Sequence, residues 1–133
     1  VQRPDDRILL ARRSGVVYGD GLWGLPGGHA DSSESWARAA VRETHEEVGV
    51  HVDLADLVPI GVQRYLDEGT HGVDAFFRTR RWSGEPQPVS ECSQVAWFEP
   101  GDLPLDALPW LARTLRSHLL QGEWFTEMGM DAQ

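Results

Sequence analysis

In the segment 33–49, the residues suited to an apolar face recur at the spacing of an amphipathic helix. Five of them follow the positions i, i+3, i+4, i+7 and i+11 and so share one apolar helix face: Ala37, Ala40, Val41, Thr44 and Val48. Suitable N-cap residues occur at 31–33, and Gly49 follows where a left-handed residue commonly ends a helix. We therefore predict a helix that begins near Ser33–Trp36 and ends at Val48.

The remaining apolar residues predict strands and one further helix. A second stripe with the same helical spacing lies near the end of the chain, at Leu108, Leu111, Ala112, Leu115 and Leu119. Segments typical of strands occur at 7–11, 22–25, about 56–65, 73–80 and 95–98. Strands interleaved with two core-facing helices favour a mixed α/β fold in which helices pack on a sheet.

Length and charge limit the organisation of the chain and its partners. The 133 residues suit one domain over 1–133, and the opening on Val1 rather than Met leaves room for missing N-terminal residues. We expect no membrane-spanning helix and no signal peptide. Twelve basic against 21 acidic residues give a net charge of −9, which argues against nucleic acid or a membrane as the main partner. A phosphate-bearing ligand would therefore need an imported positive charge, such as a metal ion.

The single cysteine, Cys92, cannot form an intramolecular disulfide. A chain without a disulfide framework fits a reducing compartment, so we expect a cytoplasmic protein. Free cysteine behaves as a small hydrophobic residue, and Cys92 is therefore expected to be a buried thiol.

The helix face opposite the apolar stripe carries three glutamates close together. Glu43 precedes Glu46 by three residues and Glu47 by four, and like charges at these spacings cost about 0.2–0.5 kcal/mol per pair. They also lie in the last turns, where the helix dipole favours cations. This arrangement makes sense if a cation binds, since hard ions such as Mg²⁺ prefer clustered oxygen ligands. An ordinary solvated acidic face, with Glu34–Arg38 and Arg42–Glu46 as ion pairs, is the alternative from the helix alone.

A glycine-rich loop before this helix completes a longer motif. All seven fixed positions of the Nudix box, G-x5-E-x7-R-E-U-x-E-E-x-G-U, are matched, by Gly28, Glu34, Arg42, Glu43, Glu46, Glu47 and Gly49. Val50 fits the last aliphatic position, whereas Thr44 departs from the first. Residues 8–13, 22–28 and 91–98, together with Leu103 and Pro104, also resemble parts of the family outside the box. The chain thus resembles the Nudix hydrolases over most of its length, which implies an α/β/α sandwich with a mixed sheet between helices.

The resemblance implies a metal site for hydrolysing a phosphoanhydride bond. Its ligands would be the carboxylates of Glu43, Glu46 and Glu47 and the carbonyl of Gly28, and they would hold Mg²⁺, for which Mn²⁺ can substitute. Arg42 and Glu34 would support these ligands without touching the metal.

Residues outside the box are expected to complete the active site. The general base is a box glutamate in some family members and a later glutamate in others, and here Glu91 is the candidate of the second kind, ahead of Glu85. By resemblance Arg13 would reach substrate phosphate or base, with a surface arginine as the alternative. Trp23 is a candidate for stacking on a base, and a core position is its alternative.

Within the family the chain looks most like the small MutT-type (deoxy)nucleoside triphosphate pyrophosphohydrolases, which release pyrophosphate and a monophosphate. This likeness rests on the short length of the chain, on residues 25–29, and on the pairs 91–92 and 97–98. Alternatives are an ADP-ribose or dinucleoside polyphosphate pyrophosphatase, a non-catalytic Nudix-like nucleotide-binding module, and an acidic interaction domain without any site. A non-catalytic module would have lost Glu46 or Glu47, and both are present. A homodimer is frequent in the family, although no residue demands one.

Overall fold

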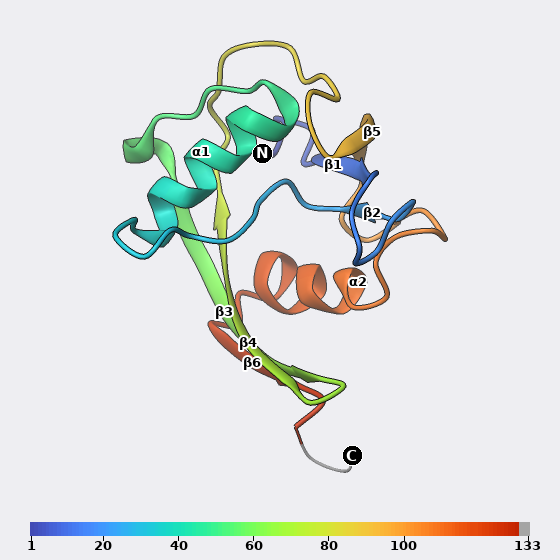
Figure 1. The fold of residues 1–133 in the computed structure, drawn as a ribbon. Coiled ribbons are helices and arrows are strands. Elements are labelled where there is room, and N and C mark those ends of the chain that lie inside the picture. Colours follow the sequence, from blue (N-terminus) through green and yellow to red (C-terminus); the bar gives the residue numbers. More distant parts are fainter. Residues whose placement is uncertain (131–133) are drawn as a thin grey trace.

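The computed structural model describes residues 1–130 and places two three-stranded sheets beside two main helical segments (Figure 1). The strands are β1 (Ile8–Arg13), β2 (Trp23–Gly24), β3 (Val58–Asp67), β4 (Thr70–Arg78), β5 (Cys92–Phe98) and β6 (Phe125–Met128). Helix α1 spans Trp36–Val48, and a short 3-10 turn, η1, spans Leu54–Asp56. Helix α2 (Leu111–Thr114) runs directly into a π-helical segment, η2 (Leu115–Leu120). Among the described residues no helix is long and apolar enough to cross a membrane.

Strand β1 is the middle strand of the first sheet and is buried on both faces. It pairs antiparallel with β2 on one side and with β5 on the other. Leu10 belongs to the apolar cluster that includes Leu111 of α2, whereas Leu9 belongs to the cluster that includes Val48 of α1. Alternate side chains of a strand point to opposite faces, so this sheet lies between the two helices (Figure 1). The predicted α/β sandwich of the Nudix type is confirmed.

The second sheet has β3 in the middle, with β4 antiparallel on one side and β6 parallel on the other. The predicted strands are confirmed with shifted ends, since β4 begins at Thr70 rather than at residue 73. Strand β6 was not predicted. Only four residues long, it is held by its pairing with Val62–Tyr65, a long-range contact that no local pattern reveals.

Helix α1 ends as predicted but begins with a different cap. Ser35, rather than residues 31–33, is the N-cap, and its Oγ accepts a hydrogen bond of 3.2 Å from the Arg38 N–H. At the other end Gly49 is left-handed, with φ at 73°. Thr44 and Val48 of the predicted stripe are buried together with Ala39, while the other members of the stripe are only partly buried.

The buried face of the second helix is displaced from the predicted stripe. Leu111 and Leu115 are buried as expected, but Ala112 is exposed, and Thr114 and His118 take the buried positions instead. These polar residues tolerate burial because each has hydrogen-bond partners on the second sheet. A stripe traced from apolar residues alone could not show this.

Candidate metal and active site

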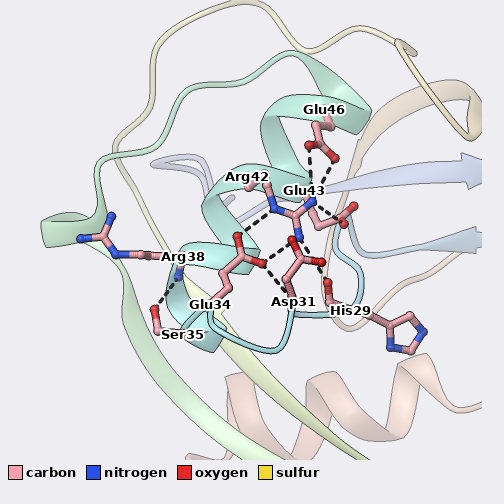
Figure 2. Close-up of polar contacts among 8 residues, drawn as sticks. All are labelled: His29, Asp31, Glu34, Ser35, Arg38, Arg42, Glu43 and Glu46. Carbon is pink, nitrogen blue, oxygen red and sulfur yellow. Dashed lines mark hydrogen bonds and ion pairs between the residues drawn. The ribbon is translucent and has the colours of Figure 1, made fainter.

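Arg42 is the centre of an ion-pair network on α1 and the loop before it (Figure 2). Its guanidinium meets the Glu34 carboxylate through two hydrogen bonds of 2.8 Å each. Nη1 donates to Glu43 at 3.0 Å and to Glu46 at 3.2 Å, and Nη2 donates to the carbonyl of His29 at 3.3 Å. One arginine therefore ties three carboxylates of the box to the backbone of the glycine-rich loop.

Glu34 is the most strongly stabilised carboxylate of this network. Hydrogen bonds from Arg42, and then one from the Asp31 N–H at 3.1 Å, lower the pKa of Glu34 to about 2. The same bonds raise the pKa of Arg42 above its usual value, mainly through Glu34. The paired fork-to-carboxylate geometry fixes the orientation of the guanidinium as well as its charge.

The glycine-rich loop lies directly against the carboxylates of α1. The Gly27 N–H donates a hydrogen bond of 3.2 Å to Oε2 of Glu47, and Gly27 has φ at 154°, which other residues rarely adopt. A Cβ added to Gly28 would lie 2.7–2.9 Å from the carboxyl atoms of Glu43. Real side-chain carbons do not approach so closely, so glycine is required for this contact.

The surroundings of Glu47 oppose the ionisation of its carboxyl. The pKa of Glu47 is raised to about 7, mainly by burial and in smaller part by the charges of Glu43 and Glu91. The Gly27 N–H and the Arg13 guanidinium only partly oppose this effect. Carboxylates beside bare loop backbone form the oxygen-rich donor set that a hard divalent ion prefers, so the chemistry of the residues present fits such an ion.

The predicted ligands are neighbours, but they do not converge on one point. Arg42 holds Glu43 and Glu46, whereas Glu47 faces Gly27. The Glu46 side chain is 52% exposed. Over residues 1–130, no group of three or more His, Cys, Asp or Glu side chains is gathered closely enough to hold a metal ion. Arg42 thus occupies the carboxylates that a cation would otherwise share.

The loop that follows β4 fixes the end of α1, which the sequence did not indicate. The Glu47 carbonyl accepts hydrogen bonds from the N–H groups of Val89 at 2.9 Å and Ser90 at 3.2 Å. The Cys92 thiol also donates to it at 3.4 Å, and burial raises the pKa of this half-buried thiol. Because these contacts bring the loop to the last turn, the charge of Glu91 acts on Glu47. The side chain of Glu91 is exposed, and its φ is 58°.

Arg13 lies near the carboxylates but also organises the loop after β1. Its Nε donates to the Tyr18 carbonyl at 2.8 Å, and its guanidinium carbon lies 5.9 Å from the centroid of the Tyr18 ring. Its charge lowers the pKa of Glu47. Arg13 therefore lies on the side of the molecule that carries the site, and it holds one loop there.

The expectation that Trp23 stacks on a base does not fit its position. Trp23 is only 7% exposed and belongs to the core cluster that includes Leu10 and Leu111. Its ring meets Phe98 edge to face, with centroids 5.1 Å apart. The large apolar ring is satisfied by core packing, so the structure places Trp23 in the core.

Known proteins resemble this chain over most of its length. The family model for the NUDIX domain matches residues 1–118. A Bacillus subtilis (strain 168) protein, provisionally named an 8-oxo-dGTP diphosphatase, is 32% identical over 82% of this chain and 68% of that protein. The RNA pyrophosphohydrolase of Erythrobacter litoralis (strain HTCC2594) is 28% identical over 83% of this chain and 84% of that protein. The crystal structure of the MutT NUDIX hydrolase from Burkholderia pseudomallei superposes with a TM-score of 0.75 at 33% identity, covering 84% of this chain and 88% of that one. The chain therefore belongs to the Nudix hydrolase family, as a MutT-like member.

Proposed function

We propose that this chain hydrolyses a (deoxy)nucleoside triphosphate to the monophosphate and pyrophosphate, using Mg²⁺ or Mn²⁺. Family membership supplies the reaction class, which is hydrolysis of a phosphoanhydride bond with the help of a divalent ion. The contact of Gly27 and Gly28 with Glu47 and Glu43 is the observation that carries the proposal for the site. When bound, the ion would shield the phosphate charge and increase the acidity of a bound water.

The carboxylates of α1 and the guanidinium of Arg42 have separate tasks in this proposal. Glu43, Glu46 and Glu47 hold the ion together with the carbonyl of Gly28. Arg42 limits the rotation of Glu43 and Glu46, because it already bonds to both in the structure. Residues that orient metal ligands in this way commonly change metal affinity or activity by about 10- to 100-fold.

Glu91 is the proposed general base. Its charge is close enough to Glu47 to raise the pKa of that carboxyl. The hydrogen bonds of Val89 and Ser90 to the Glu47 carbonyl fix the loop that carries it. As an exposed carboxylate it is free to take a proton from the attacking water, whereas Glu43 is engaged by Arg42. A box glutamate is the alternative base.

Two kinds of substrate compete for this assignment. The relative named for 8-oxo-dGTP and the MutT structure favour a small nucleoside triphosphate. The RNA pyrophosphohydrolase relative favours a triphosphorylated RNA end. We favour the small nucleotide because a net charge of −9 opposes binding of a long polyanion.

A substrate panel with added Mg²⁺ tests the proposal. It comprises the common and oxidised (deoxy)nucleoside triphosphates, triphosphorylated RNA, ADP-ribose and a dinucleoside polyphosphate. We expect pyrophosphate and monophosphate from the free triphosphates. Pyrophosphate released mainly from RNA would favour the second candidate. Products only from ADP-ribose or the dinucleoside would overturn the proposal.

A further inference from the structure

Alternate residues of the second sheet face α2 and η2. Thr114 donates from its Oγ1 to Oε1 of the buried Gln63 at 2.6 Å, and His118 stacks on Phe76 with ring centroids 5.6 Å apart. Gln63 pairs with Asp74, two residues before Phe76, so Gln63 and Phe76 lie on the same face. Because successive side chains of a strand point to opposite faces, the residues that alternate with these two lie on the other face.

Two rows of side chains cross the second sheet on that other face. Each row takes one residue from β4, one from β3 and one from β6, and directly paired residues project from the same side of a sheet. The rows are neighbours, since their β3 residues are two positions apart. We call the six residues the outer sheet face, and in the order β4, β3, β6 its rows are Ala75, Val62 and Phe125, then Val73, Arg64 and Glu127.

The outer sheet face exposes apolar side chains. Val73 is 51% exposed and Phe125 is 53% exposed, and none of the six residues belongs to either core cluster. In Figure 1 α2 lies on the opposite face, and α1 lies near the end of the sheet where β3 begins and β4 ends. Within residues 1–130 no helix therefore covers β6 on this side. Apolar side chains gathered on an exposed face are typical of surfaces that bind another protein.

The polar residues of the outer sheet face carry one charge of each sign. Nη1 of Arg64 donates to Oε2 of Glu127 at 2.9 Å, and the two side chains are 45% and 44% exposed. Such an exposed ion pair contributes little to the stability of one copy. It leaves the face with no net charge, whereas the whole chain carries −9. Because two chains of the same net charge repel each other, they approach at the lowest electrostatic cost through a neutral apolar face.

A second copy of the chain complements the outer sheet face in both rows. Two sheets commonly pack face to face with their strands nearly aligned. If the two-fold axis runs along the strands between β3 and β6, each β3 side chain lies opposite its row partner from β6 of the other copy. Arg64 then faces Glu127 of the second copy and Val62 faces its Phe125, and symmetry makes each contact twice. Opposite charges and apolar groups are matched in this way without any further residue.

We propose that the outer sheet face joins two copies of this chain in a symmetric dimer, with Arg64 of each copy opposite Glu127 of the other. The proposal goes beyond the proposed function, because the glutamates of α1 and the loop before them take no part in this contact. Strand β6 begins at Phe125, beyond residue 118, where the match to the family model ends. The contact therefore depends on a strand that the family match does not include.

Sedimentation velocity over a range of concentrations tests the dimer. The mass of the wild type should rise from the 14.9 kDa of one chain toward twice that value as the concentration increases. Arg64→Glu and Glu127→Arg should each weaken dimerisation at least about 100-fold, because like charges then face each other across the contact. Mixed in equal amounts, the two variants should form a one-to-one dimer, since one face then carries two negative charges and the other two positive charges. A mixed dimer would also show that both variants are folded.

Arg80→Glu is the matched control, because the Arg80 side chain is also 45% exposed and pairs at 2.9 Å with Asp6, which is not part of the outer sheet face. This variant should dimerise as the wild type does. A wild type that stays monomeric at every concentration would overturn the proposal without any variant. Arg64→Glu that dimerises as tightly as the wild type would also overturn it, since another surface would then hold the copies together. The same conclusion follows if the two charge variants stay monomeric after mixing.

Discussion

The N–H of Gly27 donates a hydrogen bond of 3.2 Å to the carboxylate of Glu47, and so joins the glycine-rich loop to the last turn of α1. The bond offsets part of the burial that raises the pKa of Glu47 to about 7. The charges of Glu43 and Glu91 oppose ionisation further. A divalent cation would relieve both effects.

Removing a carboxylate charge from the end of α1 should abolish most of the activity. We expect Glu46→Gln and Glu47→Gln each to lower kcat by at least about 100-fold, because each removes a negative oxygen ligand of the proposed ion. The melting temperature should change little, since neither side chain forms part of the core clusters. Glu99→Gln, at an exposed carboxylate, is the matched control and should be fully active. Full activity of both site variants would end the metal-site model.

A methyl group on Gly28 should displace Glu43. The added Cβ would lie 2.7–2.9 Å from the carboxyl atoms of Glu43, so that carboxylate must rotate away. We expect Gly28→Ala to weaken Mn²⁺ binding, measured by calorimetry, and to lower kcat/KM about tenfold or more. Gly101→Ala is the control, because nothing lies within 4 Å of its added Cβ. Equal Mn²⁺ affinity in Gly28→Ala and the wild type would show that Glu43 is not a ligand.

Metal binding should release a proton near neutral pH. Without metal the raised pKa of Glu47, about 7 against an ordinary 4.5, means that its carboxyl supports the fold fully below pH 4.5 and loses this contribution as pH rises through 7. A cation selects the ionised form, so its apparent affinity and the activity should rise between pH 6 and 8. Titrations in buffers of different ionisation enthalpy count the released protons, and Glu47→Gln is expected to release fewer. Turnover that survives complete chelation would contradict the metal requirement.

The Glu34–Arg42 pair should stabilise the fold except in acid. The pKa of Glu34 is lowered to about 2 from 4.5, so its stabilising contribution is present above pH 4.5 and is lost as pH falls toward 2. Glu34→Gln should therefore lower the melting temperature at pH 6, and the difference from wild type should shrink at pH 2.5. Glu99→Gln again serves for comparison. A difference independent of pH would mean that the fork-to-carboxylate bonds add nothing to stability.

The local sequence was sufficient to predict helix α1 and the cluster of glutamates on its surface. The helical spacing puts Glu43, Glu46 and Glu47 on one side wherever the helix lies, because the geometry of one helix depends on its own residues. The end at Gly49 follows for the same reason, since a left-handed glycine is a local signal. The position of β1 was also readable, as a run of apolar residues buried on both faces.

The contacts that make these residues a site depend on tertiary packing, since they join parts of the chain that are far apart. The pattern around Trp23 could not distinguish a base-stacking ring from a core ring, and packing against Phe98 settled the question. The loop amides on the Glu47 carbonyl and the parallel pairing of β6 likewise have no local signature. Spacing along one element follows from backbone geometry, whereas the approach of separate elements follows from how their side chains fill the space between them.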